Sequence, residues 1–234
     1  PIIENMAAFF GTLACQGGPI SWIGQHRVHH AYSDQHEDPH DITKGFWYSH
    51  IGFIFNRRDD LNSSEETAHY CPDIAKRKFF LFLERYMIPV QFVVGFTLFG
   101  LGGLLGSAQG FDFFNATSFV VWGIFVRLVV GYHVTWLVNS ATHTWGSRPN
   151  ITTDKSCNNW WVGILAFGEG WHNNHHAQPR AARHGWRWWQ LDQTWIFITV
   201  LKRLHLVRNI ELPKMPVAKL DCQRQNQNYT MRNV

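Results

Sequence analysis

The part of the sequence best suited to chemistry is a histidine pattern, H-x-x-H-H, that occurs twice, as QHRVHH and as WHNNHH. Positions i, i+3 and i+4 lie on one face of a helix. We therefore expect the three imidazoles of each copy to converge on one point, as metal ligands must. Imidazole suits zinc, copper, iron and nickel. The six residues are His26, His29, His30, His172, His175 and His176.

A third element, N-S-A-T-H, adds one more histidine. Asn139 and His143 are four residues apart, so they share a helix face at the end of an apolar stretch. Seven histidines are too many for one metal, since a catalytic metal also needs an open position. The pattern predicts two metals that share these ligands. The alternative is a surface cluster without function, and the combination of two triplets with Asn139 and His143 argues against it.

A carboxylate-bridged di-iron bundle is another way to build a two-metal centre. It uses Glu-x-x-His pairs together with further glutamates from long helices. Such pairs occur at Glu66/His69 and at Glu169/His172. Glu169, however, stands between two glycines, which disfavour a helix interior, and no matching inward glutamates are evident. The sequence therefore favours a centre built from histidine.

The remaining histidines have less specific signals. Asp38, His36 and His40 follow the first triplet closely, in DQHEDPHD. They could orient the ligand imidazoles through hydrogen bonds, or they could form an ordinary polar loop, and the sequence leaves both readings open. Five others are predicted to be structural or exposed: His50, His69, His133, His184 and His205.

Two apolar stretches predict membrane spans. Residues 88–107 carry no charge, and twenty helical residues cover about 30 Å, the thickness of a bilayer core. Gly102 and Gly106 form a small-xxx-small pair suited to close helix packing. Residues 118–138 form the second stretch, and Arg127 within it must find a partner in protein or water. A buried helix of a soluble core is the alternative, and the lack of charge disfavours it.

The distribution of positive charge predicts how the chain crosses the membrane. Of the 21 Lys and Arg residues, only Arg127 lies within either stretch, and the loop at 108–116 has none. By the positive-inside rule, both flanks are cytoplasmic. Two crossings return the chain to the side on which it started. The first triplet and everything after residue 138 can therefore meet on one membrane face.

Composition agrees with a helical membrane protein that also has a large polar part. Charged residues make up 16%, below the roughly 25% of soluble domains, and the 12 Trp and 18 Phe suit a membrane boundary. A net charge of +4 does not call for nucleic acid. We predict an all-α membrane bundle with a cytoplasmic helical cap that holds the two-metal site. Four cysteines without a C-x-x-C are predicted to be free thiols in a reducing compartment: Cys15, Cys71, Cys157 and Cys222.

Three stretches of the chain resemble the Δ9-type, stearoyl desaturase-like membrane acyl desaturases. They are GGPISWIGQHRVHHAYSDQHEDPHDITKGFWYSHIGF, TWLVNSATHTWGSRP and GEGWHNNHHAQPRAARHGWRWWQLD. The resemblance runs from about residue 15 to residue 212 and is closest to the acyl-lipid branch of bacteria, cyanobacteria and plants. The family also has an H-x-x-x-x-H box ahead of the first triplet. We expect that box and a first pair of spans to lie upstream of Pro1, so that two of about four spans are visible here.

The resemblance implies a set of roles for the residues. The seven histidines would bind two iron ions, and Asn139 would hold one of them through a water. The family bends its acyl tunnel at a hydrogen-bonded group that matches Gln16, Trp22 and Thr135. Residues 1–212 would form one membrane desaturase domain, and 213–234 a polar tail.

The resemblance also implies the reaction, which is O₂-dependent insertion of a cis double bond into a fatty-acyl chain, with Δ9 expected. No haem or flavin motif is present, so ferredoxin or cytochrome b5 would supply electrons. The animal acyl-CoA branch has Arg-Asp where this chain has Gly24-Gln25, which favours a lipid-linked acyl substrate in the membrane over acyl-CoA. Two alternatives stay open: a membrane di-iron fatty-acyl or lipid hydroxylase, and a non-catalytic metal-binding membrane protein.

Overall fold

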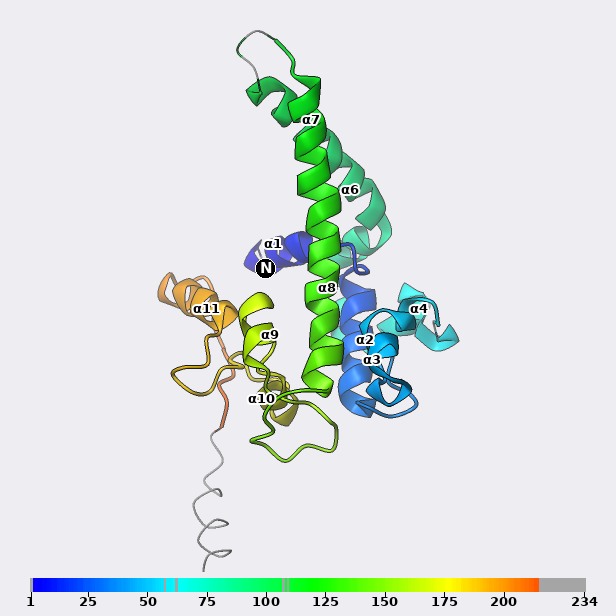
Figure 1. Cartoon of the computed structure of the whole chain (residues 1–234), viewed down its shortest axis with the longest axis vertical. Helices are drawn as coiled ribbons and strands as arrows, with labels where there is room; N and C mark the ends of the chain where they lie inside the picture. The colour runs from blue at the N-terminus through cyan, green and yellow to red at the C-terminus, as the bar shows by residue number, and fades with distance from the viewer. Residues whose placement is uncertain (1, 57, 62, 107, 109, 215–234) are drawn as a thin grey trace, which may run out of the picture.

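The structure is a computed structural model that describes residues 2–56, 58–61, 63–106, 108 and 110–214. This part of the chain is helical and holds no β-strand, only isolated β-bridges that pair Ser147 with Asn158 and Asn158 with Trp171. Two long helices stand side by side, and most of the remaining chain gathers around one of their ends (Figure 1). The all-α prediction is confirmed for the described residues.

The helices differ greatly in length. In chain order the α-helices are α1 (Ile2–Thr12), α2 (Pro19–Tyr32), α3 (Phe46–His50), α4 (Ser64–Ala68), α5 (Pro72–Ala75), α6 (Lys78–Leu105), α7 (Phe113–Val120), α8 (Arg127–Ser140), α9 (Trp160–Leu165), α10 (His172–Ala177) and α11 (Gln193–Arg203). A π-helical segment, Val121–Val126, joins α7 to α8, and 3-10 turns form at Ile42–Lys44, Gly52–Ile54, Asp59–Leu61 and Ala141–His143.

The second predicted span and residues 88–105 of the first lie within helices long and apolar enough to cross a membrane, Lys78–Leu105 and Phe113–His143. The first predicted span ends at residue 107, two residues beyond the end of its helix, and residue 107 lies outside the described residues. Each helix begins earlier than its apolar stretch. The predicted loop at 108–116 is shorter than expected, because α7 already begins at Phe113. Asp112 caps this helix by accepting a hydrogen bond from the backbone N–H of Asn115 at 3.0 Å.

A kink divides α6 near the point where the predicted span begins. Tyr86 leaves the helical conformation, with φ −109° and ψ 18°. Pro89, three residues later, has no N–H to donate to the carbonyl of Arg85, and a proline inside a helix is a common cause of such a kink. The first turns, which carry Lys78 and Arg85, are thereby set apart from the charge-free part that follows.

The glycines of α6 allow the close approach to α7. A Cβ atom on Gly102 would lie 2.8 Å from the carbonyl oxygen of Asn115 and equally close to the ring of Phe119. A Cβ atom on Gly106 would overlap the side chain of Asn115. The predicted packing of small residues is therefore confirmed, since larger side chains would push the two helices apart.

Arg127 finds the partners that a charge inside a span requires. Its Nε donates to the carbonyl of Gly123 at 2.7 Å, and its Nη1 donates to the carbonyl of Leu13 at 2.8 Å. Leu13 follows α1, so the cation lies at the carbonyl end of that helix, where the helix dipole favours positive charge. This bond ties α1, which runs roughly at right angles to α8 in Figure 1, to that helix.

The polar half of the molecule is built from short elements with small cores. Ile20 of α2 packs with Cys71 and Phe80, and Ala141 packs with Val162 and Ala166. Of the cysteines, Cys15, Cys71 and Cys157 are free thiols as predicted, and Cys222 lies outside the described residues. The predicted polar tail, 213–234, also lies outside them except for Pro213 and Lys214.

Candidate metal centre

The fold brings all seven predicted histidines together at the polar end of the long helices. Their ring nitrogens form two adjacent groups, and within each group the atoms lie within 4.8 Å of one another. The first group is His29, His143, His172 and His176, and the second is His26, His30 and His175. Their rings come from α2, from α10 and from the 3-10 turn that ends the second long helix.

Each H-x-x-H-H triplet is divided between the two groups, so the expectation that its three rings converge on one point is wrong. A helix turns about 100° per residue, which leaves i and i+4 about 40° apart but i+3 and i+4 about 100° apart. His26 and His30 therefore share a group, and His29 joins the other one. In the second triplet, His172 and His176 share a group, and His175 crosses to the rings of α2.

The distances within the second group match those of nitrogens around one metal. Nε2 of His30 lies 3.1 Å from Nε2 of His26 and 2.8 Å from Nε2 of His175. Two nitrogens bound to one ion at the usual 2.0–2.1 Å and at right angles lie about 3 Å apart. His30 faces both of its neighbours through the same atom, which is the arrangement of ligands that point at a shared centre.

Three carboxylates fix the rings of the first group. Nδ1 of His29 lies 2.9 Å from Oδ1 of Asp38, and Nδ1 of His143 lies 3.1 Å from Oδ2 of Asp34. The third pair, His176 and Asp154, is 2.7 Å apart. Each carboxylate accepts the Nδ1 proton and so leaves Nε2 with a free lone pair. Metal-binding histidines are held in this way in many proteins.

The unpaired nitrogens show that the site fits a metal. Nε2 of His29, His143 and His176 and both ring nitrogens of His172 are buried and have no hydrogen-bond partner among the described residues. A buried polar atom without a partner costs free energy. A cation between these rings would supply the missing partner, and an all-imidazole donor set suits iron or another transition metal.

The rings also carry the charge state that metal binding requires. Burial, together with the neighbouring histidines, lowers the pKa of His26 to about 3 and that of His176 to about 4. Burial likewise lowers the pKa of His30 to about 2. At neutral pH these imidazoles are uncharged, which is the form that donates a lone pair to a metal.

The two asparagines inside WHNNHH hold α10 in place, a role that the sequence did not indicate. Oδ1 of Asn174 accepts from the side chains of Asn150 and Asn158 at 2.9 and 2.8 Å, and its Nδ2 donates to the carbonyl of His184 at 2.8 Å. Asn173 bonds the backbone of Asn150 through both ends of its amide. Both side chains are fully buried. They fasten two loops to the helix that carries the second triplet.

Of the three residues proposed to orient the ligands, two lie beside the histidine cluster and one does not. Asp38 is buried on His29, and His40 lies beside that ring with its centroid 5.4 Å away. His36 is exposed, and no hydrogen bond from it to the cluster occurs within the described chain. Sequence reasoning missed Asp34 and Asp154, which stand in loops without any recognisable spacing to the histidines.

His184 is a further residue that the sequence placed outside the site. Its ring packs on that of His175 with centroids 4.3 Å apart, and its Nδ1 lies 3.4 Å from Oε2 of Glu169. Glu169, the residue considered for a carboxylate-bridged centre, thus pairs with His184. Of the other histidines, His50 bonds Ser140 at 2.9 Å and His133 at 3.1 Å, a structural role as expected.

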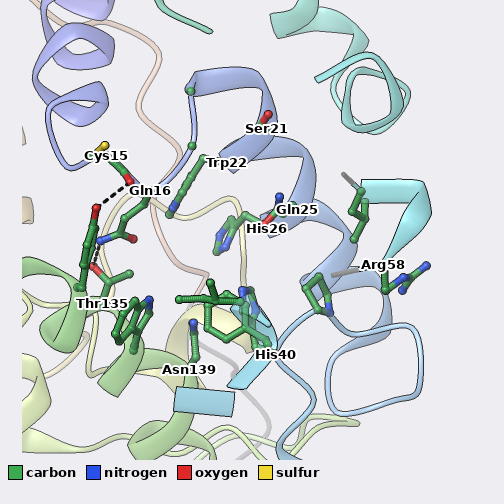
Figure 2. A pocket seen from close by; sticks show the side chains of 18 of the residues that line it. Cys15, Gln16, Ser21, Trp22, Gln25, His26, His40, Arg58, Thr135 and Asn139 are labelled. Carbon is green, nitrogen blue, oxygen red and sulfur yellow. Dashed lines mark hydrogen bonds between the residues drawn. The ribbon is translucent and has the colours of Figure 1, made fainter. Parts of the chain in front are cut away.

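A cavity of about 520 Å³ opens beside the second histidine group. Figure 2 shows its wall, which includes His26, His40 and Asn139. The residues predicted to shape an acyl tunnel are here as well. The side-chain amide of Gln16 donates to the hydroxyl of Thr135 at 3.0 Å, and the ring of Trp22 stacks on that of His26 at 5.0 Å. The bond joins the turn before α2 to α8.

A second cavity, of about 530 Å³, lies beyond that bond. Its wall is mostly apolar and belongs chiefly to α1, the turn after it and the start of α2. Gln16, Trp22 and Thr135 line both cavities. The two spaces therefore meet at the residues predicted to bend a tunnel, with the histidines on one side and the apolar wall on the other.

Together, the fold and the site define a helical protein with two candidate membrane spans and a histidine cluster that could hold metal, beside two cavities with shared lining residues. The family model for fatty acid desaturases matches residues 1–206. The chain is 47% identical over 90% of its length to the sn-1 stearoyl-lipid 9-desaturase of Anabaena variabilis, and 46% identical over 90% to the sn-1 stearoyl-lipid 9-desaturase of Synechocystis. It is 40% identical over 97% to the palmitoyl-monogalactosyldiacylglycerol delta-7 desaturase of Arabidopsis thaliana.

The chain belongs to the fatty acid desaturase family. It spans 71, 61 and 56% of the lengths of these three relatives. The predicted family and enzyme class, an oxidoreductase that desaturates acyl chains, are confirmed. A non-catalytic metal-binding protein is thereby disfavoured. The ligand role of each histidine and the tunnel role of Gln16, Trp22 and Thr135 stay predictions.

Proposed function

We propose that this protein inserts a cis double bond into a lipid-linked fatty-acyl chain, using O₂ and a di-iron centre. The observation that carries the proposal is the pair of histidine groups beside a cavity whose wall contains the Gln16–Thr135 hydrogen bond. In the overall reaction, an acyl –CH₂–CH₂– unit, O₂, two protons and two donor electrons give –CH=CH– and two waters.

The ligands in this proposal are the seven histidines, with Asn139 holding one iron through a water. Two iron ions would supply the oxidising power that an unactivated C–H bond requires. The protein's own part is to hold the rings. Asp34, Asp38 and Asp154 keep the Nδ1 protons in place, and burial keeps the imidazoles neutral.

The cavity residues would select the C–C unit that reacts. Gln16 and Thr135 join the walls at the bend, and Trp22 presents its ring to the acyl chain on one side and to His26 on the other. Holding a flexible acyl chain in one register places one C–C unit in reacting geometry before the reaction begins. The same positioning also keeps water away from the reacting atoms. Two of the three relatives are named as 9-desaturases, which supports Δ9, and the name of the third specifies delta-7.

The substrate is proposed to be lipid-linked because the three relatives are named for lipid substrates, and because Gly24 and Gln25 replace the charged pair of the animal acyl-CoA branch. The histidine centre is proposed to face the cytoplasm, as the positive-inside rule predicts. Ferredoxin or cytochrome b5 is the proposed donor. The excess of basic residues would attract an acidic carrier.

Expression from the complete gene in a host that makes only saturated acyl chains tests the proposal. We expect a cis alkene in membrane lipids, located by derivatisation and mass spectrometry, and about two iron ions per purified chain. A hydroxylated acyl chain without alkene would instead identify a hydroxylase. Separate assays with labelled acyl-lipid and labelled acyl-CoA distinguish the substrates, and turnover of acyl-CoA alone would contradict the lipid-linked assignment.

A further inference from the structure

A carboxylate on the first long helix caps the helix that carries the first histidine triplet. The N-cap residue of α2 is Gly18, which offers no side chain to accept the first free N–H groups. Pro19 has no N–H, so the free donors of the first turn belong to Ile20 and Ser21. Both donate to Oε2 of Glu84, at 2.8 and 3.2 Å. Glu84 thus accepts the hydrogen bonds that an N-cap side chain usually accepts, although it belongs to another helix.

The two helices touch at this contact. A Cβ atom on Gly18 would lie 2.3 Å from Oε2 of Glu84 and 2.7 Å from its Cα, so only glycine allows α2 to begin so close to α6. The hydroxyl of Ser21 donates to the second carboxylate oxygen, Oε1. A negative charge at a helix N-terminus is also favoured by the helix dipole. The carboxylate therefore satisfies three donors of one helical turn.

The contact lies where the site and the cavity meet. Glu84 lines the cavity beside the histidines, and it precedes the kink of α6 at Tyr86. The helix that it caps carries Trp22 and, one turn later, His26. A shift of the start of α2 would move both of these rings relative to Thr135 on α8. The distance between the bend and the histidines therefore depends on how α2 is held.

We propose that Glu84 is a positioning residue that holds α2 against α6 and so fixes which carbon–carbon bond lies beside the histidine groups. Through α2 it sets the register between the Gln16–Thr135 bond and the rings of the first triplet. Glu84 itself would contact neither substrate nor metal. This positioning role rests on the proposed desaturation, because its outcome is the position of the double bond.

Two variants test the contact from its two sides. Glu84→Gln removes the charge but keeps one oxygen that can accept a hydrogen bond, so the fold is retained. Gly18→Ala keeps the carboxylate but forces the two helices apart. Asp112→Ala is the matched control, because Asp112 caps α7 at the far end of the spans. All three are made in the full-length protein.

The first measurement is amide hydrogen exchange of the purified protein without substrate, at a peptide that covers Ile20 and Ser21. We expect exchange about five- to tenfold faster in Glu84→Gln, because the charge and one of the two acceptor oxygens of the cap are removed, and wild-type exchange in Asp112→Ala. The second is product position. Both variants at the contact should form a second double-bond isomer, and the control should form only the wild-type isomer.

The two measurements separate the possible failures. Wild-type exchange in Glu84→Gln would refute the cap. Faster exchange with a single, unmoved double bond would refute the positioning role and leave Glu84 as a structural cap. A wild-type protein that forms no alkene but protects Ile20 and Ser21 would refute the proposed function, and the positioning role with it, while the cap would stand.

Discussion

Nδ1 of His176 and Oδ2 of Asp154 lie 2.7 Å apart, although Asp154 belongs to a loop and His176 to α10. The loop residue thereby decides which ring nitrogen of His176 carries the proton. Asp38 and Asp34 do the same for His29 and His143. In each of these three pairs, the carboxylate lies outside the helix or turn that carries the histidine.

Replacing Asp154 by asparagine should weaken metal binding at the first group. The amide can still accept the Nδ1 proton, but the negative charge that makes the imidazole a better ligand is lost. Changes of this kind cost about 10- to 100-fold in metal affinity. Metal analysis during titration with a chelator measures the effect. Glu211→Gln, which removes an exposed carboxylate paired with Arg180, is the control, and equal affinities of the two variants would contradict the assignment.

The division of the histidines predicts that the two metals can be removed separately. His172→Ala removes a ligand of the first group, and His26→Ala removes one of the second. Each variant should retain about one metal ion per chain and lose desaturation, since a structured site binds metal only with its ligand set intact. His69→Ala changes an exposed histidine and should keep both ions. Loss of both ions from either ligand variant would show that the groups form one inseparable site.

The hydrogen bond between Gln16 and Thr135 predicts a difference between two substitutions of the threonine. Thr135→Val removes the hydroxyl and leaves the Gln16 amide without its partner, at a cost of about 1–3 kcal/mol, whereas Thr135→Ser keeps the bond. We expect mixed double-bond positions from the valine variant and the wild-type position from the serine variant. Thr97→Val, which removes a hydroxyl that bonds its own helix, is a further control. Identical products from all three would refute the bend.

The approach of α6 to α7 predicts opposite effects for two glycines of one helix. Gly102→Ala places a Cβ atom 2.8 Å from the Asn115 carbonyl and should destabilise the protein by about 1–3 kcal/mol. Gly100→Ala meets nothing within 4 Å and should be neutral or stabilising by up to about 1 kcal/mol. Thermal unfolding in detergent micelles compares them. Equal shifts would mean that the two helices do not pack as described.

The sequence by itself determined the chemistry and the class of fold. Histidine spacing pointed to metal ligands, charge-free length pointed to spans, and two crossings predicted that His26 and His172 meet on one face. These features are readable because each depends on residue type and on distances along a regular helix. Composition and helix geometry carry them without any knowledge of how the helices pack.

Only the tertiary structure decided how the ligands are shared and held. The 100° step of the helix sends His29 away from His30, and the facing helix determines which rings each one meets. Asp34, Asp154 and Glu84 act on partners far away in the chain, from loops or from another helix. Contacts of this kind leave no periodic trace, because they depend on where the backbone turns and not on the spacing of residues.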